Sequence, residues 1–230
     1  MSVSKIALFV TGTDTEIGKT LVSSALLYAF VQAGLRVAAM KPVAAGVTLH
    51  NGVRVNEDIE LLRAQANIEL PEHEMSPYLW DEPIAPHIAA QKRGVVMRAK
   101  VIRQAYLAAA QRADAIIVEG VGGFCVPLSS EENMADVAVS LNLPVVMVVG
   151  MRLGCINHAL LTAEAIRARG LTLAAWVANT VDRNMPYRDE NIQTLSEALA
   201  APCLGRIPHF DTPSAELAVG YLDISCLQVG

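Results

Sequence analysis

The chain has 230 residues, of which 53% are apolar and 18% charged, a composition typical of a globular protein with a large core. Its formal net charge of −5 excludes the basic character expected of a protein that binds nucleic acid or a membrane surface. The length favours a single domain over residues 1–230. No apolar run reaches the roughly 20 residues of a membrane helix, and the first residues lack a signal-peptide pattern, so we expect a cytoplasmic protein. The four cysteines show no metal-ligand spacing and are expected to be reduced.

Short apolar runs alternate with segments of helical period along most of the chain. The predicted strands cover residues 6–10, 36–40, 115–118, 144–149, 173–178 and 203–207, and the predicted helices cover residues 20–33, 96–112, 158–169 and 191–199. Because the strands are continuous apolar runs, both of their faces are expected to be covered, which is typical of parallel strands. The sequence therefore predicts an α/β fold with a mostly parallel central sheet and helices on both faces. Residues 46–86 show no regular pattern, and we expect a long loop there that acts as a lid or contacts substrate.

The turn between the first predicted strand and helix has the sequence GTDTEIGKT, residues Gly12–Thr20. Backbone N–H groups of such a loop bind phosphate, and the helix N-terminus favours the negative charge. Lys19 is expected to reach the β- and γ-phosphates of a nucleotide, and the Thr20 hydroxyl to bind Mg²⁺. Thr13 stands where the common form of this loop has glycine. A plain turn with a solvated lysine is the alternative.

Further polar residues follow other predicted strands, at the sheet edge where ligands bind in α/β proteins. Glu119 ends the third strand, a position from which nucleotide-binding folds hold Mg²⁺, and the glycines of segment Gly120–Gly123 allow close approach of phosphate. Lys41, fixed by Pro42, supplies a second cation that suits phosphoryl transfer. Asp58 is a candidate second carboxylate. The alternatives are an acid that only ends a strand and a solvated lysine.

Two asparagines stand at the ends of predicted elements. Asn157 precedes a predicted helix, where it caps the helix and leaves free N–H groups for an anion such as a carboxylate, or caps it without any ligand. Asn179 follows a strand, and residues 180–182 lack the lysine of the guanine-reading N-K-x-D motif. Asn179 can still bond a purine edge from the end of its strand, and this fits adenine at least as well as guanine.

Five segments together resemble the dethiobiotin synthetase family. They are VTGTDTEIGKT (10–20), MKPVAAG (40–46), VEGVGG (118–123), PVVMVVGMRLGCINHALLTAEAI (144–166) and WVAN (176–179), and the resemblance extends over about residues 9–210. That family has a three-layer P-loop NTPase-like fold, and its longer phosphate loop accounts for Thr13. The resemblance implies a homodimer that converts 7,8-diaminopelargonate, CO₂ and ATP to dethiobiotin, ADP and phosphate, through a carbamate and a carbamic–phosphoric anhydride.

The resemblance also implies roles for individual residues. Catalysis is expected from Lys19 and Lys41, and Mg²⁺ binding from Thr20, Asp58 and Glu119. The expected ATP contacts are Glu16, Ile17, Gly18, Lys19, Thr20, Asp58, Glu119, Gly120, Val121, Gly122, Asn179, Pro208, His209 and Phe210. The expected substrate contacts are Thr15, Lys41, Ala45 and Asn157, the last of these across the dimer. Because relatives often carry a hydroxyl residue at the position of Ala45, the backbone is expected to make that contact here.

The main alternative is a switch ATPase of the partition or septum-positioning class, which shares the sheet order and the phosphate loop. Those proteins usually carry a lysine early in the loop, where this chain has Asp14, and they often present a membrane or DNA surface. We expect neither a membrane nor a nucleic acid as partner. A guanine-nucleotide switch is disfavoured by Thr180, which stands at the lysine position of the guanine motif.

Overall fold

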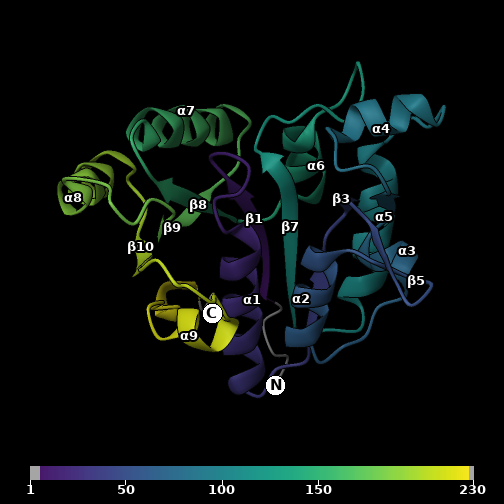
Figure 1. The fold of residues 1–230 in the computed structure, drawn as a ribbon, viewed down its shortest axis with the longest axis horizontal. Coiled ribbons are helices and arrows are strands. Elements are labelled where there is room, and N and C mark those ends of the chain that lie inside the picture. Colours follow the sequence, from purple (N-terminus) through teal and green to yellow (C-terminus); the bar gives the residue numbers. More distant parts are fainter. Residues whose placement is uncertain (1–5, 228–230) are drawn as a thin grey trace.

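The computed structural model describes residues 6–227 and is built around a six-stranded sheet (Figure 1). From edge to edge the strands are β10 (Cys203–Ile207), β9 (Leu173–Thr180), β8 (Val145–Met151), β1 (Ile6–Gly12), β7 (Ala115–Gly123) and β2 (Val37–Met40). Every neighbouring pair is parallel. The predicted parallel sheet is therefore confirmed, and the carboxyl ends of all six strands face one side of the molecule.

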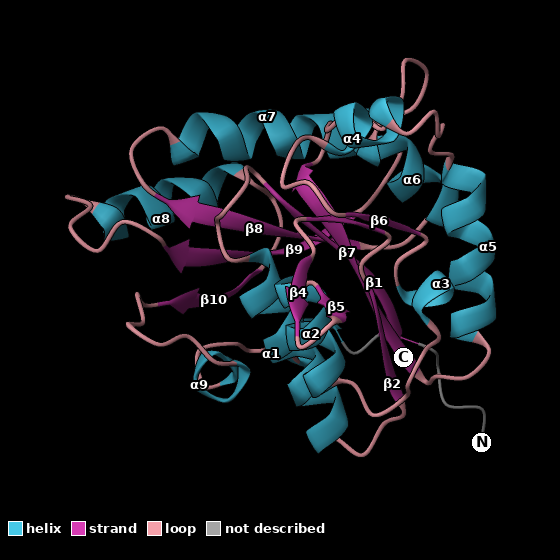
Figure 2. Cartoon of the chain, turned by 45° about the vertical axis from the view of Figure 1, so that its right-hand side comes forward, coloured by secondary structure: helices cyan, strands magenta, loops and turns pink. Residues whose placement is uncertain are grey.

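Helices cover both faces of the sheet, as predicted (Figure 2). One face carries α1 (Lys19–Gln32), α2 (Glu57–Gln65) and α9 (Ala215–Val219), and the other carries α5 (Ala99–Ala110), α6 (Met134–Leu141) and α7 (Cys155–Ala168), with α8 (Arg188–Ala198) packed beside α7. The first crossover runs from β1 toward β2, whereas the later crossovers run the opposite way, so right-handed connections place their helices on opposite faces. No helix within residues 6–227 is long and apolar enough to cross a membrane.

The strands are buried on both faces, which explains their unbroken apolar runs. Every residue of β8 is buried, and Trp176 of β9 is fully enclosed between the layers. The predicted strand ends agree with the structure to within a few residues, except for β7. That strand continues five residues beyond the predicted end at Val118, because it stays paired with β1 as far as the Gly12–Gly123 pair.

The prediction of a long loop over residues 46–86 is wrong. Strand β3 (Val43–Ala45) pairs with β6 (Tyr78–Trp80), and β4 (Thr48–His50) forms a hairpin with β5 (Val53–Val55). Along the chain, helices α2 and α3 (Glu72–Met75) lie between β5 and β6, and α4 (Pro86–Lys92) follows β6. Each of these elements has nine residues or fewer, which is too short for a hydrophobic period to be read.

Two more helices have no counterpart in the prediction, and a third begins earlier than expected. Asn133 and Asp136 form a capping box that starts α6, a signal that is visible in the sequence as N-x-x-D before an apolar run. Helix α9 and a short 3₁₀ turn at Ser225–Leu227 lie in the tail after Phe210. Helix α7 begins at Cys155 with Gly154 as its N-cap, so Asn157 lies in the first turn and the prediction that it caps the helix is wrong.

Candidate functional site

The phosphate-binding loop joins β1 to α1 at the carboxyl edge of the sheet (Figure 1). Its residue Ile17 is fully buried and packs against two glycines. A Cβ atom at Gly12 would lie 2.8 Å from Ile17 Cδ1, and one at Gly150 of β8 would lie 2.5 Å from Ile17 Cγ2. These two glycines leave the room that Ile17 occupies, and the apolar side chain anchors the loop to the sheet.

The end of the loop is held by the end of β9. Asn179 Nδ2 donates a hydrogen bond of 2.8 Å to the Ile17 carbonyl, and a Cβ atom at Gly18 would lie only 2.2 Å from the same nitrogen. Gly18 also has a φ of 85°, in the left-handed region that favours glycine. Asn179 therefore shapes the loop backbone in this structure, and its contact with adenine stays a prediction.

Lys19 is buried at the start of α1 and lies in a setting that disfavours its charge. Its Nζ donates a hydrogen bond of 2.8 Å to the Asp14 carbonyl. Burial, together with the nearby charge of Lys41, lowers the pKa of Lys19 to about 8 from its usual 10.5. The Asp14 side chain forms an ion pair with Arg152, and its Oδ1 accepts a hydrogen bond from the Thr15 N–H. A polyanion in the loop would offset the unfavourable environment of Lys19.

Four side chains from distant parts of the sequence meet beside the loop. Lys41 Nζ lies 2.5 Å from Asp58 Oδ2 and 2.6 Å from Glu119 Oε1. Thr20 Oγ1 lies 2.9 Å from Asp58 Oδ1 and 2.8 Å from Glu119 Oε1. We call these four residues the carboxylate–lysine cluster. The sequence predicted each of them as a site residue, and the structure brings them together.

The elements that carry the cluster explain its burial. Glu119 lies inside β7 rather than at its end and is 0% exposed, while Lys41 follows β2 and is 4% exposed. Asp58 lies in the first turn of α2 and not in a loop. Burial opposes the charge of Lys41, but Glu119 and Asp58 outweigh it and raise the pKa of Lys41. Burial likewise opposes the charge of Asp58, and Lys41 outweighs it and lowers the pKa of Asp58.

The cluster has donor atoms that suit Mg²⁺. Glu119 Oε2 is buried and has no hydrogen-bond partner among residues 6–227, so one carboxylate oxygen is left for an additional ligand. Thr20, Asp58 and Glu119 supply only oxygen, and in the described part of the chain no group of three or more His, Cys, Asp or Glu residues forms a complete metal site. Mg²⁺ is commonly bound by one or two carboxylates together with substrate phosphates, so these residues fit it.

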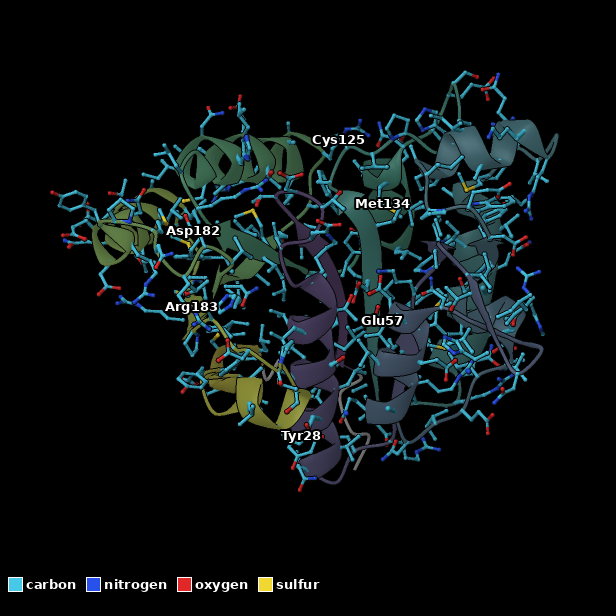
Figure 3. The ribbon with its side chains drawn as sticks, in the orientation of Figure 1. Tyr28, Glu57, Cys125, Met134, Asp182 and Arg183 are labelled. Atoms are coloured by element: carbon cyan, nitrogen blue, oxygen red, sulfur yellow. The ribbon has the colours of Figure 1, made fainter. Side chains whose placement is uncertain are left out.

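A groove of about 450 Å³ opens on the exposed side of the loop. It is lined by Thr13, Asp14, Thr15, Gly123, Phe124, Cys125, Val126, Pro127, Leu161, Thr162 and Ala165. Figure 3 shows Cys125 close to α7, beyond the end of β7. Thr15 and Glu16 are exposed, and Glu16 adopts a φ of 56°. The wall on the β7 side begins at Gly123, directly after Gly120–Gly122, the ATP-contact segment predicted from the sequence.

Other predicted site residues lie farther from the cluster. Segment Pro208–Phe210 follows β10, the sheet edge opposite β2, where the Phe210 ring packs against Tyr221 with the centroids 5.8 Å apart. Asn157 is exposed in the first turn of α7. Ala45 ends β3, and its carbonyl accepts a hydrogen bond from Asn56. The ligand contacts expected of these residues stay predictions.

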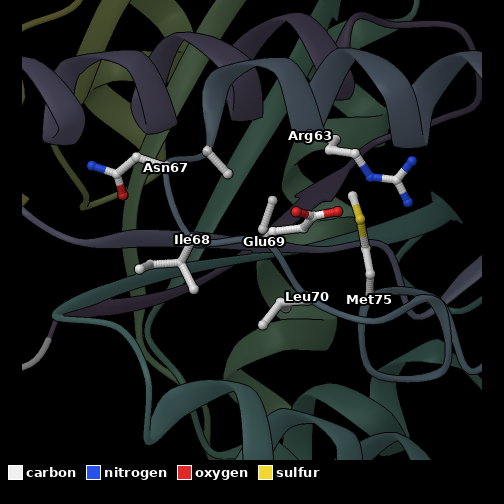
Figure 4. Close-up of a pocket in the computed structure, with 8 residues that line it drawn as sticks. Arg63, Asn67, Ile68, Glu69, Leu70 and Met75 are labelled. Atoms are coloured by element: carbon white, nitrogen blue, oxygen red, sulfur yellow. The ribbon is translucent and has the colours of Figure 1, made fainter.

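A cavity of about 350 Å³ lies elsewhere, between the end of α2 and Met75 (Figure 4). Two of its polar residues already have structural partners. Asn67 accepts a hydrogen bond from the Val37 N–H and donates one to the Leu35 carbonyl, and Arg63 pairs with Glu60. None of the predicted site residues lines this cavity.

Three residues that shape the site were not assigned roles from the sequence. Asp14 and Arg152 link the phosphate loop to the turn before α7, and Asn56 caps α2. The cap could have been found, since asparagine before an acidic pair is a helix-start signal. The ion pair could not, because 138 positions separate its partners.

The fold is shared with several solved nucleotide-binding proteins. The signal recognition particle 54 kDa protein from Aeropyrum pernix K1, solved in complex with GDP, matches with a TM-score of 0.57 and 16% identity over 99% of this chain, which spans 45% of that protein. The MinC:MinD cell division complex of Aquifex aeolicus matches with a TM-score of 0.57 and 16% identity, over 95% of this chain and 87% of that one. A ParA family ATPase from Chlorobium tepidum TLS matches with a TM-score of 0.56 and 15% identity, over 91% and 86%. At these identities the likeness shows the fold, which is that of P-loop NTPases.

The family is given by a comparison of sequence. Residues 7–216 match the profile of the family AAA_26, described as an AAA domain, so the match spans most of the chain and includes the phosphate loop and the whole carboxylate–lysine cluster. The chain is therefore a member of the AAA_26 family and a nucleotide-hydrolysing P-loop domain.

Proposed function

We propose that this chain is a dethiobiotin synthetase, which uses ATP to join CO₂ to 7,8-diaminopelargonate and close the ureido ring. The AAA_26 family includes such enzymes. The observation that carries the proposal is the position of Lys41. This lysine lies outside the phosphate loop, in the MKPVAAG segment of the resemblance, and its Nζ contacts both carboxylates beside Thr20. A second buried lysine at that point suits transfer of a phosphoryl group to an anionic acceptor.

The proposed reaction needs no nucleophile from the protein. One amine of the substrate attacks CO₂ and loses a proton, which gives a carbamate. A carbamate oxygen takes the γ-phosphoryl group of ATP, and ADP leaves. The second amine then attacks the carbamoyl carbon, phosphate leaves, and the ring closes with loss of a proton. Lys19 and Lys41 stabilise the charge on the transferred phosphoryl group, and Mg²⁺ bound by Thr20, Asp58 and Glu119 would neutralise phosphate charge.

The groove beside the phosphate loop is the proposed site of the diamine. Thr15 lines it, and Leu161 of α7 forms part of its wall. Asn157 and Leu161 lie four residues apart on α7 and Leu153 lies just before the helix; all three are exposed, Leu153 at 94% and Leu161 at 57%. Such an apolar surface beside a groove is typical of a protein interface. In the proposed homodimer a second copy covers this surface and brings its own Asn157 to the substrate carboxylate.

The test is the identity of the product. The purified chain is incubated with ATP, Mg²⁺, 7,8-diaminopelargonate and ¹³C-bicarbonate, and the products are analysed by mass spectrometry. We expect dethiobiotin with one ¹³C atom, formed in equal amount with ADP, and a rate about 100- to 1,000-fold lower from the Lys41→Met variant. The exposed residue Lys100 provides the control, since Lys100→Met should keep the wild-type rate. ATP hydrolysis that is indifferent to both diamine and bicarbonate would reject the proposal.

A switch ATPase is the second candidate, and the fold likeness to the MinC:MinD complex and the ParA family ATPase favours it. The same assay separates the two functions. A switch would hydrolyse ATP without the diamine and would form no product that contains ¹³C. Its rate would instead respond to a macromolecular partner.

A further inference from the structure

Asn56 makes more contacts than a helix cap requires. It is 6% exposed and precedes α2, where its Oδ1 accepts a hydrogen bond of 3.2 Å from the Ile59 N–H. That bond is the usual capping interaction, for which aspartate or serine would serve equally well. The other end of the side chain, Nδ2, donates a hydrogen bond of 2.9 Å to the Ala45 carbonyl. Asparagine accepts through Oδ1 and donates through Nδ2, two separate atoms, so it can bond the helix and a carbonyl at the same time, which aspartate cannot do.

The two hydrogen bonds of Asn56 connect the segments that carry Asp58 and Lys41, two members of the carboxylate–lysine cluster. Asp58 lies two residues after Asn56 in the first turn of α2 and contacts both Thr20 and Lys41. Ala45 ends β3, the strand that begins two residues after Lys41. Neither α2 nor β3 belongs to the central sheet, since β3 pairs only with β6 in a separate two-stranded sheet. The hydrogen bond between Asn56 and Ala45 therefore links α2, which packs on α1, directly to β3, which lies outside the central sheet.

We propose that Asn56 is a positioning residue that sets the affinity of the nucleotide site for Mg²⁺. Its Nδ2 bond holds α2 against β3, so that the Asp58 carboxylate stays at 2.9 Å from the Thr20 hydroxyl. Residues that orient metal ligands without touching the metal commonly change metal affinity by about 10- to 100-fold when they are removed. The inference rests on the proposed role of Asp58 as a Mg²⁺ ligand and not on the identity of the second substrate.

A second asparagine in the chain separates capping from positioning. Asn133 caps α6 and accepts hydrogen bonds from the Ala135 and Asp136 N–H groups. Its helix lies on the other face of the sheet from α2 and supplies none of the four cluster residues. Loss of the Asn133 side-chain amide thus reproduces the effect of a weakened cap without moving Asp58.

The experiment measures how ADP binding depends on Mg²⁺. A fluorescent ADP analogue is titrated against the Asn56→Ser and Asn133→Ser variants over a range of Mg²⁺ concentrations, and again in EDTA. Serine still caps the helix but is too short to reach the Ala45 carbonyl. We expect the half-saturating Mg²⁺ concentration to rise about tenfold in Asn56→Ser only, while ADP affinity in EDTA matches that of Asn133→Ser. The melting temperature of Asn56→Ser should be the lower of the two, because the Ala45 carbonyl loses its donor. Equal Mg²⁺ dependence in the two variants would overturn the proposal.

Two further variants check the positioning role of Asn56 and the premise that Asp58 binds Mg²⁺. Asn56→Asp has the shape of the native residue and keeps the cap, but it lacks the donor to Ala45. Its added negative charge near Asp58 would by itself tighten Mg²⁺ binding, so weaker or unchanged binding in this variant supports the positioning role, and tighter binding contradicts it. Asp58→Asn must also weaken Mg²⁺ binding, since an unchanged value would remove the premise. None of these measurements involves the diamine, so failure of the dethiobiotin proposal would be seen separately.

Discussion

The two sides of the site differ in how completely this chain builds them. On the phosphate side, Lys19, Lys41 and Glu119 are all less than 10% exposed and are held by hydrogen bonds and packing. On the groove side, Thr15 and Asn157 are exposed, and Leu153 is 94% exposed before α7. Exposed leucines beside a groove lack the contacts that buried residues have, whereas the phosphate side is already packed. The chain alone therefore packs the phosphate side, which we propose binds nucleotide and Mg²⁺, and in our proposal the groove side is completed by a substrate and a second copy.

The difference has an electrostatic reason. The Glu119 carboxylate can be fully buried beside the half-buried Asp58 because Lys41 pairs with both. The groove half carries mainly apolar and hydroxyl side chains, which can be left open to water at little cost. Variants on the phosphate side should accordingly affect chemistry and stability together, while variants on the groove side should affect binding of substrate or partner alone.

The largest effect is expected from Lys41→Met. Loss of a preorganised positive charge at a transferring phosphoryl group should lower turnover about 100- to 1,000-fold, while ADP affinity changes little because the loop still binds the nucleotide. The melting temperature should also fall, since removal of one partner from a buried ion pair costs about 3–5 kcal/mol. Steady-state kinetics and ADP titration check both statements. A variant with near-normal turnover would show that Lys41 has only a structural role.

The Lys41→Met result needs one control, because destabilisation could mimic lost catalysis. Mg²⁺–ADP occupies the phosphate half and should raise the melting temperature of the variant through binding to the folded state. Turnover measured well below that melting temperature must still be low. If turnover recovers fully under those conditions, stability and not charge explains the loss.

The second-largest effect is expected from Gly18→Ala, which tests the shape of the phosphate loop. The new Cβ would lie 2.2 Å from Asn179 Nδ2, so the loop or the asparagine must move, and we expect ADP affinity to fall by about one to two powers of ten. Gly34→Ala is a matched control, because Gly34 has a φ of 81° and no atom within 4 Å of the added Cβ. Both variants should share a strain of about 1–2 kcal/mol in unfolding free energy, but only Gly18→Ala should lose ADP affinity. Equal ADP affinity in the two variants would contradict the assigned contact.

The sequence predicted the phosphate half well, because each of its residues belongs to a local pattern. The loop Gly12–Thr20 joins a strand to a helix, Lys41 precedes a proline, and Glu119 follows an apolar run, so chain order and sheet topology together predict that they converge. The pattern could not show that β7 continues beyond Glu119, since that extension depends on pairing with β1. The prediction of the six central strands succeeded for the same reason, because long buried strands have distinctive composition.

The sequence predicted the short elements around the site less well, for the opposite reason. Asp58 was recognised as a carboxylate but not as a helical residue, because α2 has only nine residues within a polar segment. The start of α7 was placed too late, since Gly154 and not Asn157 caps it. Short elements such as β3 and β6 are stabilised by contacts with distant residues, and those contacts leave no periodic signal.

A smaller effect is expected from Leu153→Asp, which tests the groove side. A charge on the 94% exposed leucine should weaken the proposed dimer and raise the KM for the diamine about tenfold, with ADP affinity unchanged. Light scattering of the purified protein measures the dimer, and steady-state kinetics measure KM. Leu217 of α9 is 51% exposed on the other face of the sheet, so Leu217→Asp controls for the general effect of a surface charge. Dimers of undiminished affinity in Leu153→Asp would show that this surface is not the interface.

The smallest effect on turnover is expected from Cys125→Ser, which distinguishes the open groove from the packed interior by thiol reactivity. Cys125 is exposed and lines the groove, whereas Cys155 is buried at the start of α7 and burial raises the pKa of its thiol. Alkylation requires the thiolate, so iodoacetamide at pH 7.5 should label Cys125 and spare Cys155 until the pH rises above the raised pKa or the protein unfolds. Peptide mass mapping identifies the labelled sites.

Because an adduct on Cys125 would occupy the groove, labelling of the wild type should inactivate it. The Cys125→Ser variant should keep its turnover within about twofold of the wild type and should resist inactivation by the reagent. Loss of activity in labelled Cys125→Ser would place the sensitive thiol elsewhere and would argue that the groove is not where the diamine binds.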